Sequence, residues 1–342
     1  MEKKRTEISE LGEFGLIERL AEGLKIKNEG IIKGIGDDAA VYDVGDKYLL
    51  TSSDMLLEGV HFDLSYMPLQ HLGYKAIAVN VSDIAAMNGT PLQITVNLGL
   101  SNRFSVEAVE AIYGGIRAAC DEYKVDLVGG DTTSSHSGLV MSVTVLGTVE
   151  KELITYRNGA RKNNILCVTG DLGAAYIGLQ VLEREKQEFM ANAEMQPQLE
   201  KYDYIVGCQL RPKARMDIIY ELRDLNVKPT SMIDVSDGLA SDSFHLCRQS
   251  NLGVAIYENK LPIDKQVYET AAEFSIDPGA CALNGGEDYE LLFTIPQDDF
   301  EKIKNHPDIH TIGYMQSASK GKSYVTGNQD VVELKAQGWR HF

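Results

Sequence analysis

Carboxylate side chains recur along this sequence beside glycine or hydroxyl residues, in segments that we expect to be tight turns at strand ends. The segments are Gly36-Asp37-Asp38, Ser52-Ser53-Asp54, Asn80-Val81-Ser82-Asp83, Gly129-Gly130-Asp131-Thr132, Asp234-Val235-Ser236-Asp237-Gly238 and Gly285-Gly286-Glu287-Asp288. A helix cap or a turn aspartate explains any one of them. As a set, they are expected to converge, because strand ends meet at the ligand-binding face of an α/β protein.

Carboxylates drawn together repel one another, by about 4 kcal/mol per pair at 4 Å with an effective dielectric near 20. Such a site persists only if the acids are protonated or if cations bind to them. The ligand atoms are all oxygens, and no His or Cys cluster lies near them in the sequence, so Mg²⁺ is expected rather than zinc. Because Mg²⁺ prefers a few carboxylates together with phosphate oxygens, the chemistry expected is phosphoryl transfer from a nucleotide.

Two glycine-rich segments match other nucleotide-binding patterns only in part. Residues 34–39 have the letters of a dinucleotide fingerprint, but Asp37 and Asp38 would place negative charge where the pyrophosphate should bind. Gly321-Lys322-Ser323 matches the end of a P-loop, but the glycine required at position 316 is Gln316. Neither segment is therefore expected to form a Rossmann turn or a P-loop.

The composition is that of an acidic globular protein. Its 342 residues are 44% hydrophobic and 24% charged, and 33 basic against 50 acidic residues give a net charge of −17. That charge disfavours nucleic acid and anionic membranes, and no apolar run reaches the roughly 18 residues of a membrane span. We therefore expect a cytoplasmic protein with reduced cysteines, no nucleic-acid partner and no membrane association, and the N-terminus does not resemble a signal peptide.

Strand-like and helical patterns alternate along the chain and must position these acids. In the first half, strands are expected at residues 48–52, 92–98, 125–128 and 139–146, with helices at 71–87 and 105–123 and Ser105 as an N-cap. In the second half, strands are expected at residues 165–169, 231–235, 254–257, 288–295 and 310–314. A polar connection at 150–164 divides the chain into domains 1–150 and 151–342.

Six motifs that occur in order resemble the thiamine-monophosphate kinase family, within the superfamily of aminoimidazole ribonucleotide synthetase and selenophosphate synthetase. They are residues 34–40, Ser53-Asp54 with 59–62, 78–87, 129–133, 233–239 and 285–291. One motif would be a weak signal, but six in register, within a likeness that runs from about residue 12 to 342, are specific. The resemblance implies an α/β fold of mixed sheets in two domains, with N-terminal sheets forming a barrel across a homodimer interface.

The activity implied by this resemblance is transfer of the γ-phosphoryl group of ATP to thiamine monophosphate. The product would be thiamine diphosphate, formed in the final step of its biosynthesis by direct in-line transfer with several Mg²⁺ ions. The acceptor phosphate oxygen is already ionised at neutral pH, so we expect no side-chain nucleophile or base. Catalysis would depend on positioning and on charge neutralisation.

The resemblance also implies roles for individual residues. Metal ligands would be Asp38, Ser53, Asp54, Asp83, Asp131, Asp234 and Asp237, with Asp37 as a second-rank candidate beside Asp38. ATP would contact Tyr113, Gly130, Asp131, Ser236 and Arg157, the last as a phosphate clamp. His61, Glu287 and Trp339 would face thiamine monophosphate, with the indole ring against the cationic thiazolium.

Several of these assignments have plainer alternatives that the sequence leaves open. His61 fits a loop histidine, Tyr113 a core residue, Arg157 a linker residue and Trp339 a packing anchor. Among sister enzymes, selenophosphate synthetase carries a reactive Cys or selenocysteine near its N-terminus, whereas residues 1–36 contain no Cys. The hydrogenase-maturation protein ends in a modified Cys, whereas this chain ends in Phe342.

Two further alternatives remain, an amidine-forming synthetase and a non-catalytic module that binds metal or nucleotide. A non-catalytic module would keep the carboxylates but release no ADP when given thiamine monophosphate. The charged, Gln-rich residues 183–203 are expected to form a surface helix or excursion and receive no function.

Overall fold

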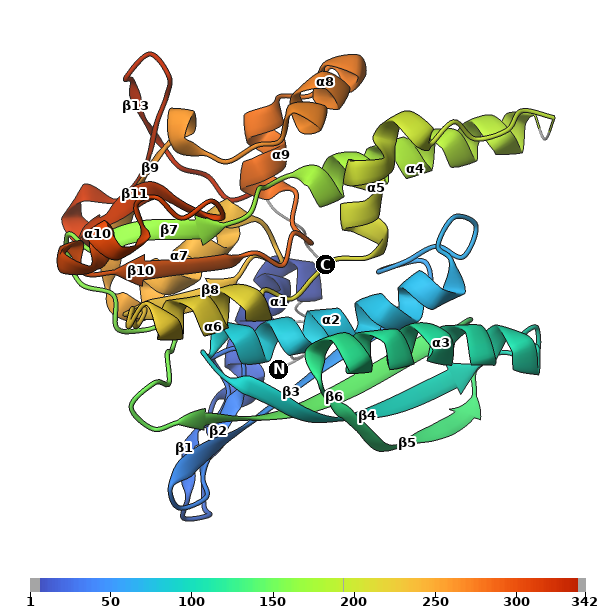
Figure 1. The fold of residues 1–342 in the computed structure, drawn as a ribbon, viewed down its shortest axis with the longest axis horizontal. Coiled ribbons are helices and arrows are strands. Elements are labelled where there is room, and N and C mark those ends of the chain that lie inside the picture. The colour runs from blue at the N-terminus through green and yellow to red at the C-terminus, as the bar shows by residue number, and fades with distance from the viewer. Residues whose placement is uncertain (1–6, 193, 338–342) are drawn as a thin grey trace, which may run out of the picture.

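A computed structural model describes residues 7–192 and 194–337 and contains two β-sheets with helices between and around them (Figure 1). The first sheet has the spatial order β1-β2-β3-β6-β4-β5. Its strands are β1 (Ile31–Lys33), β2 (Ala40–Asp43), β3 (Lys47–Leu57), β4 (Thr90–Leu100), β5 (Asp126–Ser134) and β6 (Val140–Glu150). Neighbouring strands are antiparallel except β4 and β5, which run parallel and are joined through a helix.

The two faces of the first sheet differ in exposure. Along β6 every second residue is buried, from Met141 through Val143 to Val145, as expected where one face packs on a core. Helices α2 (Leu69–Ala86) and α3 (Val106–Tyr123) cover this inner face (Figure 1). The outer face carries Met55, which is 54% exposed, and β5 is exposed along its whole length.

The second sheet has the order β13-β12-β9-β11-β7-β10-β8. Its strands are β7 (Ile165–Thr169), β8 (Ser231–Asp234), β9 (Leu252–Tyr257), β10 (Leu291–Ile295), β11 (Ile309–Ser317), β12 (Lys322–Val325) and β13 (Val331–Glu333). Every residue of β8 and β10 is buried, because helices cover both faces of this sheet. The sequence of β10 is accordingly an almost continuous apolar run, whereas β8 begins with a buried Ser231 and ends with the buried Asp234.

Seven helices belong to the second half of the described chain. They are α4 (Ala174–Ala191), α5 (Asp203–Leu210), α6 (Met216–Asp224), α7 (Leu239–Ser250), α8 (Lys265–Phe274), α9 (Pro278–Asn284) and α10 (Phe300–Ile303). Short 3₁₀ turns lie at Glu200–Tyr202, Glu258–Lys260, Gln297–Asp299 and Ala318–Lys320. Within the segment 183–203, residues 183–191 form the end of α4, and residues 200–202 form the 3₁₀ turn that leads into α5.

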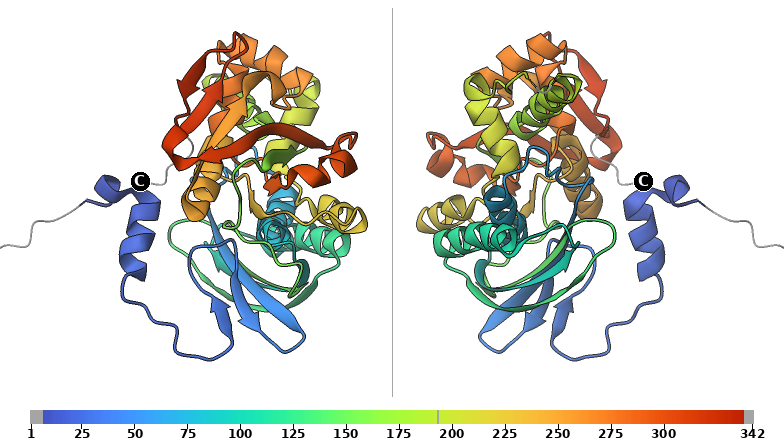
Figure 2. Two further views of the ribbon diagram at one scale, coloured as in Figure 1. Left: turned by 90° about the vertical axis from the view of Figure 1, so that its left-hand side faces the viewer. Right: turned by 90° about the vertical axis from the view of Figure 1, so that its right-hand side faces the viewer.

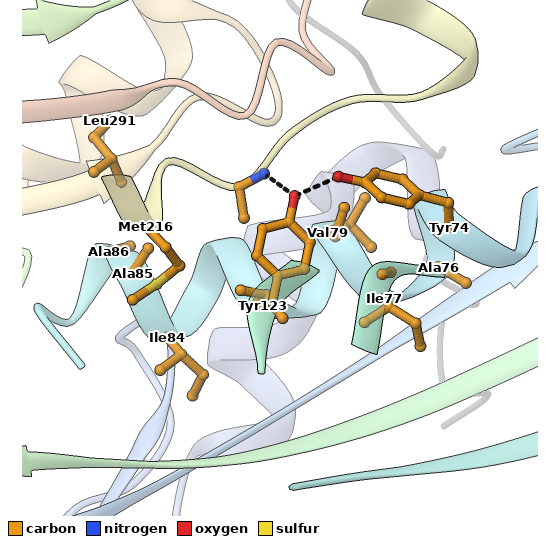
Figure 3. Close-up of a cluster of buried hydrophobic side chains, with 14 of the residues drawn as sticks. Tyr74, Ala76, Ile77, Val79, Ile84, Ala85, Ala86, Tyr123, Met216 and Leu291 are labelled. Carbon is orange, nitrogen blue, oxygen red and sulfur yellow. Dashed lines mark hydrogen bonds between the residues drawn. The ribbon is translucent and has the colours of Figure 1, made fainter. Parts of the chain in front are cut away.

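Helix α2 lies at the centre of the molecule, between the first sheet and β8 of the second. It approaches α3 closely because Gly73 and Gly115 lie at the crossing, where a Cβ on Gly115 would lie 1.8 Å from a backbone oxygen of α2. The Tyr74 and Tyr123 hydroxyls are 2.9 Å apart, and Tyr123 also accepts a hydrogen bond from the Ala214 N–H (Figure 3). These contacts fix α2 against both halves of the chain.

Helix α1 (Ile8–Ala21) stands away from both sheets, and Figure 2 shows it beside the main body. It kinks at Gly12, whose φ is +67°. Its contact with the body includes the Phe14 ring, which packs edge-on against His245 of α7 with 4.4 Å between ring centroids. No helix in the described parts of the chain is long and apolar enough to cross a membrane.

The mixed α/β fold and the main elements agree with the sequence-based expectations. The helix expected at 71–87 is α2, and the Ser105 hydroxyl caps α3 by accepting from the Ala108 N–H at 3.3 Å. The described residues form no closed barrel within one chain, so the barrel across a dimer stays a prediction. The chain passes between the sheets from Glu150 to Ile165, and the domain division at residue 150 also remains a prediction.

Three acidic segments do not lie in turns, contrary to our expectation. Residues 52–54 lie inside β3, because that strand pairs with β6 over its whole length and not only over its apolar start. Residues 80–83 lie inside α2, where the Asn80 amide donates to the Ala76 carbonyl at 2.9 Å. Residues 129–132 lie inside β5, which pairs with β4. Glycine at position 130 permits this pairing, because a Cβ there would lie 1.8 Å from the Val96 oxygen.

Candidate active site

A cavity of about 980 Å³ lies between α2, β3 and the loops at the ends of β8 and β10. Nine of the residues predicted to form the site line it, and they come from both halves of the chain. They are Asp38, Asp54, His61, Asp83, Arg157, Asp234, Ser236, Asp237 and Glu287. Every acidic motif except residues 129–132 therefore contributes to this one cavity, together with His61 and Arg157.

The centre of the cavity is a group of three carboxylates. One oxygen each from Asp38, Asp83 and Asp234 lies within 4.8 Å of the others. Asp38 precedes β2, Asp83 comes from α2 and Asp234 ends β8, so three separate elements meet here. Like charges brought this close to one another destabilise the site unless a cation or protons neutralise them.

Hydroxyl side chains orient two of these acids. The Ser82 hydroxyl donates to Asp234 Oδ2 at 2.6 Å, and the Ser52 hydroxyl donates to Asp83 Oδ2 at the same distance. Asp54 lies next to this group on β3, where its backbone N–H donates to the Asn80 side chain at 3.2 Å. Helix α2 thus supplies one acid directly and positions its neighbours.

Burial makes the ionised form of these acids costly. It raises the pKa of Asp54 to about 6 and that of Asp234 to about 7, where repulsion from Asp38 adds to the shift. Burial, with repulsion from Asp54, also raises the pKa of Asp83 well above its usual range. The buried Asp38 Oδ2 has no hydrogen-bond partner among the described residues. Raised carboxylate pKa values and an orphaned oxygen are what a bound hard cation would correct, so these residues fit Mg²⁺.

Arg157 is the cation that the chain itself places beside the acids. Its Nη2 donates to Asp38 Oδ1 at 2.7 Å, and its backbone N–H donates to Asp37 Oδ1 at 3.0 Å. The other Asp37 oxygen pairs with Lys33 at 3.3 Å. Asp37 therefore anchors Arg157 and does not line the cavity, whereas Arg157 does.

Sequence reasoning missed Asp242, which supports the loop after β8. Its Oδ2 accepts hydrogen bonds from the backbone N–H groups of Ser236, Asp237 and Gly238, at 3.1, 3.2 and 3.1 Å. Asp242 is buried in the first turn of α7, and its burial raises its pKa well above the usual range. An acid in the first turn of a helix faces unpaired backbone N–H groups, and this is a signal that could have predicted the role of Asp242.

Glu287, which also lines the cavity, lies on a tightly turned segment. Its φ is +57° and that of Tyr289 is +53°, a left-handed conformation that costs of order 1–3 kcal/mol at non-glycine residues. The segment is held against the loop after β8, because Glu287 N–H donates to the Ser236 carbonyl at 2.8 Å and Tyr289 N–H to the Val235 carbonyl at 2.9 Å. Such conformations cluster at functional sites.

Two side chains that the sequence did not single out bind the Glu287 carboxylate. Lys75 Nζ lies 3.1 Å from its Oε1, and Gln209 Nε2 donates to its Oε2 at 2.7 Å. His61 is another lining residue, and its Nδ1 accepts from the Leu57 N–H at 3.0 Å, which fixes the imidazole in the turn after β3. A Lys–Glu contact between α2 and a loop 212 residues later leaves no local sequence signal.

Other predicted site residues lie elsewhere. Ser53 points to the outer face of the first sheet, where its hydroxyl donates to the Val143 carbonyl at 3.0 Å. Gly130 and Asp131 lie on β5, three strands from β3, which is roughly 14 Å at about 4.8 Å per strand. Tyr113 lines a second cavity of about 420 Å³ beside α3. Trp339 lies outside the described residues.

Comparison with known proteins decides the family. A family model described as "AIR synthase related protein, N-terminal domain" matches residues 36–149. The thiamine-monophosphate kinase of Aquifex aeolicus is 34% identical over 336 residues, which are 98% of this chain and 99% of that protein. The Bacillus subtilis enzyme of the same name is 33% identical over 97% of this chain and 100% of its own length. The chain belongs to the thiamine-monophosphate kinase family.

Solved structures agree with this membership of the thiamine-monophosphate kinase family. A structure described as AaThiL complexed with AMPPCP and TMP has a TM-score of 0.84 and 33% identity, covering 99% of this chain and 100% of that one. A HypE chain in a HypE–HypF complex has a TM-score of 0.71 at 19% identity, covering 94% of this chain and 99% of its own, which shows a shared fold only. The two-sheet architecture therefore extends beyond the thiamine-monophosphate kinase family.

Proposed function

We propose that this protein transfers the γ-phosphoryl group of ATP to the phosphate of thiamine monophosphate and so forms thiamine diphosphate. The observation that carries this proposal is the carboxylate group Asp38, Asp83 and Asp234, gathered within 4.8 Å in the main cavity of a thiamine-monophosphate kinase family member. The full-length likeness to AaThiL complexed with AMPPCP and TMP supports the choice of both substrates.

The reaction proposed for this cavity needs charge neutralisation more than proton transfer. Mg²⁺ bound at Asp38, Asp54, Asp83 and Asp234 would neutralise the phosphate oxygens of ATP. Arg157, already held by Asp38 and Asp37, would place a fixed positive charge beside the transferring group. No general base is required, because the acceptor oxygen is ionised at neutral pH.

At the opposite end of the cavity, Glu287 and His61 would bind the thiamine part of the acceptor. Glu287 supports this role because its side chain is 29% exposed toward the cavity and its carboxylate suits a cationic thiazolium. The metal-binding and acceptor-binding ends of the cavity are joined by α2, which would keep the acceptor phosphate aligned with ATP.

A homodimer is proposed as the active form. Support comes from β5, an edge strand exposed along its length, and from the exposed apolar residues Met55, Leu92 and Val128 on or next to the open face of the first sheet. Gly130, Asp131 and Tyr113 do not line the cavity of their own chain, so any contact with ATP would come from a second copy. Light scattering should give twice 37.7 kDa for the protein and a monomer for Val128→Glu.

A cytoplasmic location is proposed as well. The five cysteines are free in the structure, and three of them are buried, which suits a reducing compartment.

The proposed activity is tested by measuring ADP and thiamine diphosphate formed from ATP, Mg²⁺ and thiamine monophosphate. Thiamine, selenide and formylglycinamidine ribonucleotide serve as alternative acceptors in parallel reactions. Release of ADP that requires thiamine monophosphate, with thiamine diphosphate as product, is the expected result. Release with another acceptor alone would move the protein to a sister activity, and no release with any acceptor despite ATP binding would leave a non-catalytic module.

A further inference from the structure

Helix α2 presents two charged side chains to the same cavity. Its eighteen residues include one Lys and one Asp, Lys75 and Asp83, and both line the cavity. They are eight residues apart, which places them on one helix face about 12 Å from each other. Asp83 belongs to the carboxylate group, whereas Lys75 lies at the Glu287 end and is only 1% exposed.

The Lys75 ammonium group uses its hydrogen-bonding capacity on protein partners. Its Nζ lies 3.1 Å from Glu287 Oε1, 3.2 Å from Glu287 Oε2 and 3.4 Å from the Gln209 carbonyl oxygen. An ammonium group has three donors, so these contacts account for all of them. Lys75 is therefore built to hold Glu287, and a phosphate would have to break those contacts to bind it directly.

The Glu287 carboxylate, in contrast, keeps capacity for a ligand. Lys75 and the Gln209 amide occupy three of its roughly four acceptor positions, and the carboxylate is partly exposed to the cavity. The Lys75 charge also offsets that of Glu287, so the pair adds no net charge to a cavity that seven aspartates already line.

We propose that Lys75 is a positioning residue that, together with Gln209, fixes the Glu287 carboxylate for the acceptor substrate. The proposal rests on the function proposed above and adds to it the group that sets acceptor affinity. Because Lys75 lies on α2 and Glu287 on a loop of the second half, the contact ties the acceptor end of the cavity to the helix that carries Asp83. The left-handed backbone of Glu287 persists only where surrounding contacts hold it, and this tether adds to the backbone hydrogen bonds of the segment.

A second buried ion pair shows what a purely structural pair looks like. Arg215 Nη1 lies 2.8 Å from Oε2 of Glu290, and Glu290 is only three residues after Glu287 in the sequence. Neither Arg215 nor Glu290 is among the described residues that line the cavity. Arg215 is therefore a matched control, a buried cation bound to a glutamate of the same segment but outside the site.

The test measures KM for thiamine monophosphate, KM for ATP and kcat in Lys75→Met, which keeps the length of the side chain and removes its charge. We expect KM for thiamine monophosphate to rise about 10- to 100-fold while KM for ATP stays within twofold, and Lys75→Arg to recover part of the loss. The double variant Lys75→Met/Glu287→Gln should be no worse than Glu287→Gln alone, because residues that act through one contact are not additive.

Calorimetric titration of thiamine monophosphate into each variant without ATP gives a readout independent of turnover. If Lys75→Met does not fold, Gln209→Leu removes the other donor to Glu287 and must show the same selective loss. The control Arg215→Met should leave both KM values within twofold.

Unchanged acceptor KM and affinity in Lys75→Met, an equal rise in the ATP KM, or additive effects in the double variant would each overturn the role of Lys75. A wild-type protein that forms no thiamine diphosphate would instead overturn the proposed function.

Discussion

Acids cluster in two regions of this molecule, and the cations around them differ. In the cavity, Arg157 is paired with only one of the four acids, Asp38. The cavity acids are Asp38, Asp54, Asp83 and Asp234. In the Arg215 group, which we define as Arg215, Glu290, Asp217 and Asp308, the guanidinium reaches all three carboxylates at 2.8 to 3.0 Å. The Thr169 hydroxyl also donates to Glu290.

The difference shows how one residue type serves two purposes. In the Arg215 group the acids are satisfied by the chain, although burial still raises the pKa of Glu290 to about 7. In the cavity the chain leaves carboxylate oxygens facing one another, an arrangement that a ligand cation must complete. Acids matched by cations of the chain therefore stabilise the fold, and unmatched acids mark the site.

The largest expected effect is loss of turnover in Asp83→Asn. Metal ions supply several kcal/mol of transition-state stabilisation, so removal of a ligand should lower kcat by roughly 10³-fold. The metal-free variant should unfold at the same temperature as wild type or higher, because repulsion from Asp54 and Asp234 is relieved. Steady-state kinetics and calorimetry of metal-free protein measure the two quantities.

The control for Asp83→Asn is Asp217→Asn in the Arg215 group, which should leave kcat within twofold. A metal-free Asp83→Asn protein that unfolds well below wild type would show that the cavity acids stabilise the fold, and the comparison between the two regions would be wrong.

The second effect is loss of stability in Arg215→Met. Removing one partner of a buried ion pair costs about 3–5 kcal/mol, because a buried charge is left uncompensated. Denaturant titration should show this loss, while kcat per folded molecule stays near wild type. A stable variant with impaired kcat would place the Arg215 group in the catalytic machinery instead.

The third effect is stabilisation by Mg²⁺. A ligand that binds only the folded state at 100 times its Kd adds about 2.7 kcal/mol to the free energy of unfolding. Wild type and Asp217→Asn should both show this rise in thermal scans, and Asp83→Asn should lose most of it. Equal stabilisation of all three proteins would mean that Mg²⁺ binds away from the cavity acids.

The sequence predicted the fold class and the convergence of the acids, and the misses have physical reasons. Periodicity located α2, and the acidic motifs located Asp38, Asp83 and Asp234. The hydroxyl and acidic residues 52–54 predict a turn, but they continue a strand whose pairing partner is distant in the sequence. In that strand, alternation directs Ser53 to the outer face while Asp54 faces the cavity.

Other site residues depend on contacts that no local pattern contains. Lys75 and Gln209 lie in helices with ordinary helical sequences. Their role follows only from their contacts with Glu287, which is distant from both in the sequence. Tertiary structure, and not motif spacing, determines such supporting residues.

The smallest expected effect concerns His245, which lines the cavity beside Arg157 and beneath Phe14. Burial, with the nearby Arg157 charge, lowers its pKa to about 4. Between pH 6.5 and 4 the unfolded chain therefore binds a proton that the folded chain does not. This difference lowers the free energy of unfolding as pH falls, by at most about 1.4 kcal/mol per pH unit. The cavity acids, whose pKa values are raised, act in the opposite direction in metal-free protein.

The variant His245→Asn removes the histidine contribution and leaves that of the acids. Denaturant titrations of metal-free protein from pH 4.5 to 7.5 should show that the variant gains stability relative to wild type as pH falls below 6.5. The lost contact with Phe14 changes stability by an amount that does not depend on pH, so the difference in slope isolates the proton. Parallel curves for the two proteins would mean that His245 is protonated in the folded state as readily as in the unfolded chain. The protonated imidazole would then help to neutralise the acids. The cavity would depend less on a metal ion than the comparison with the Arg215 group implies.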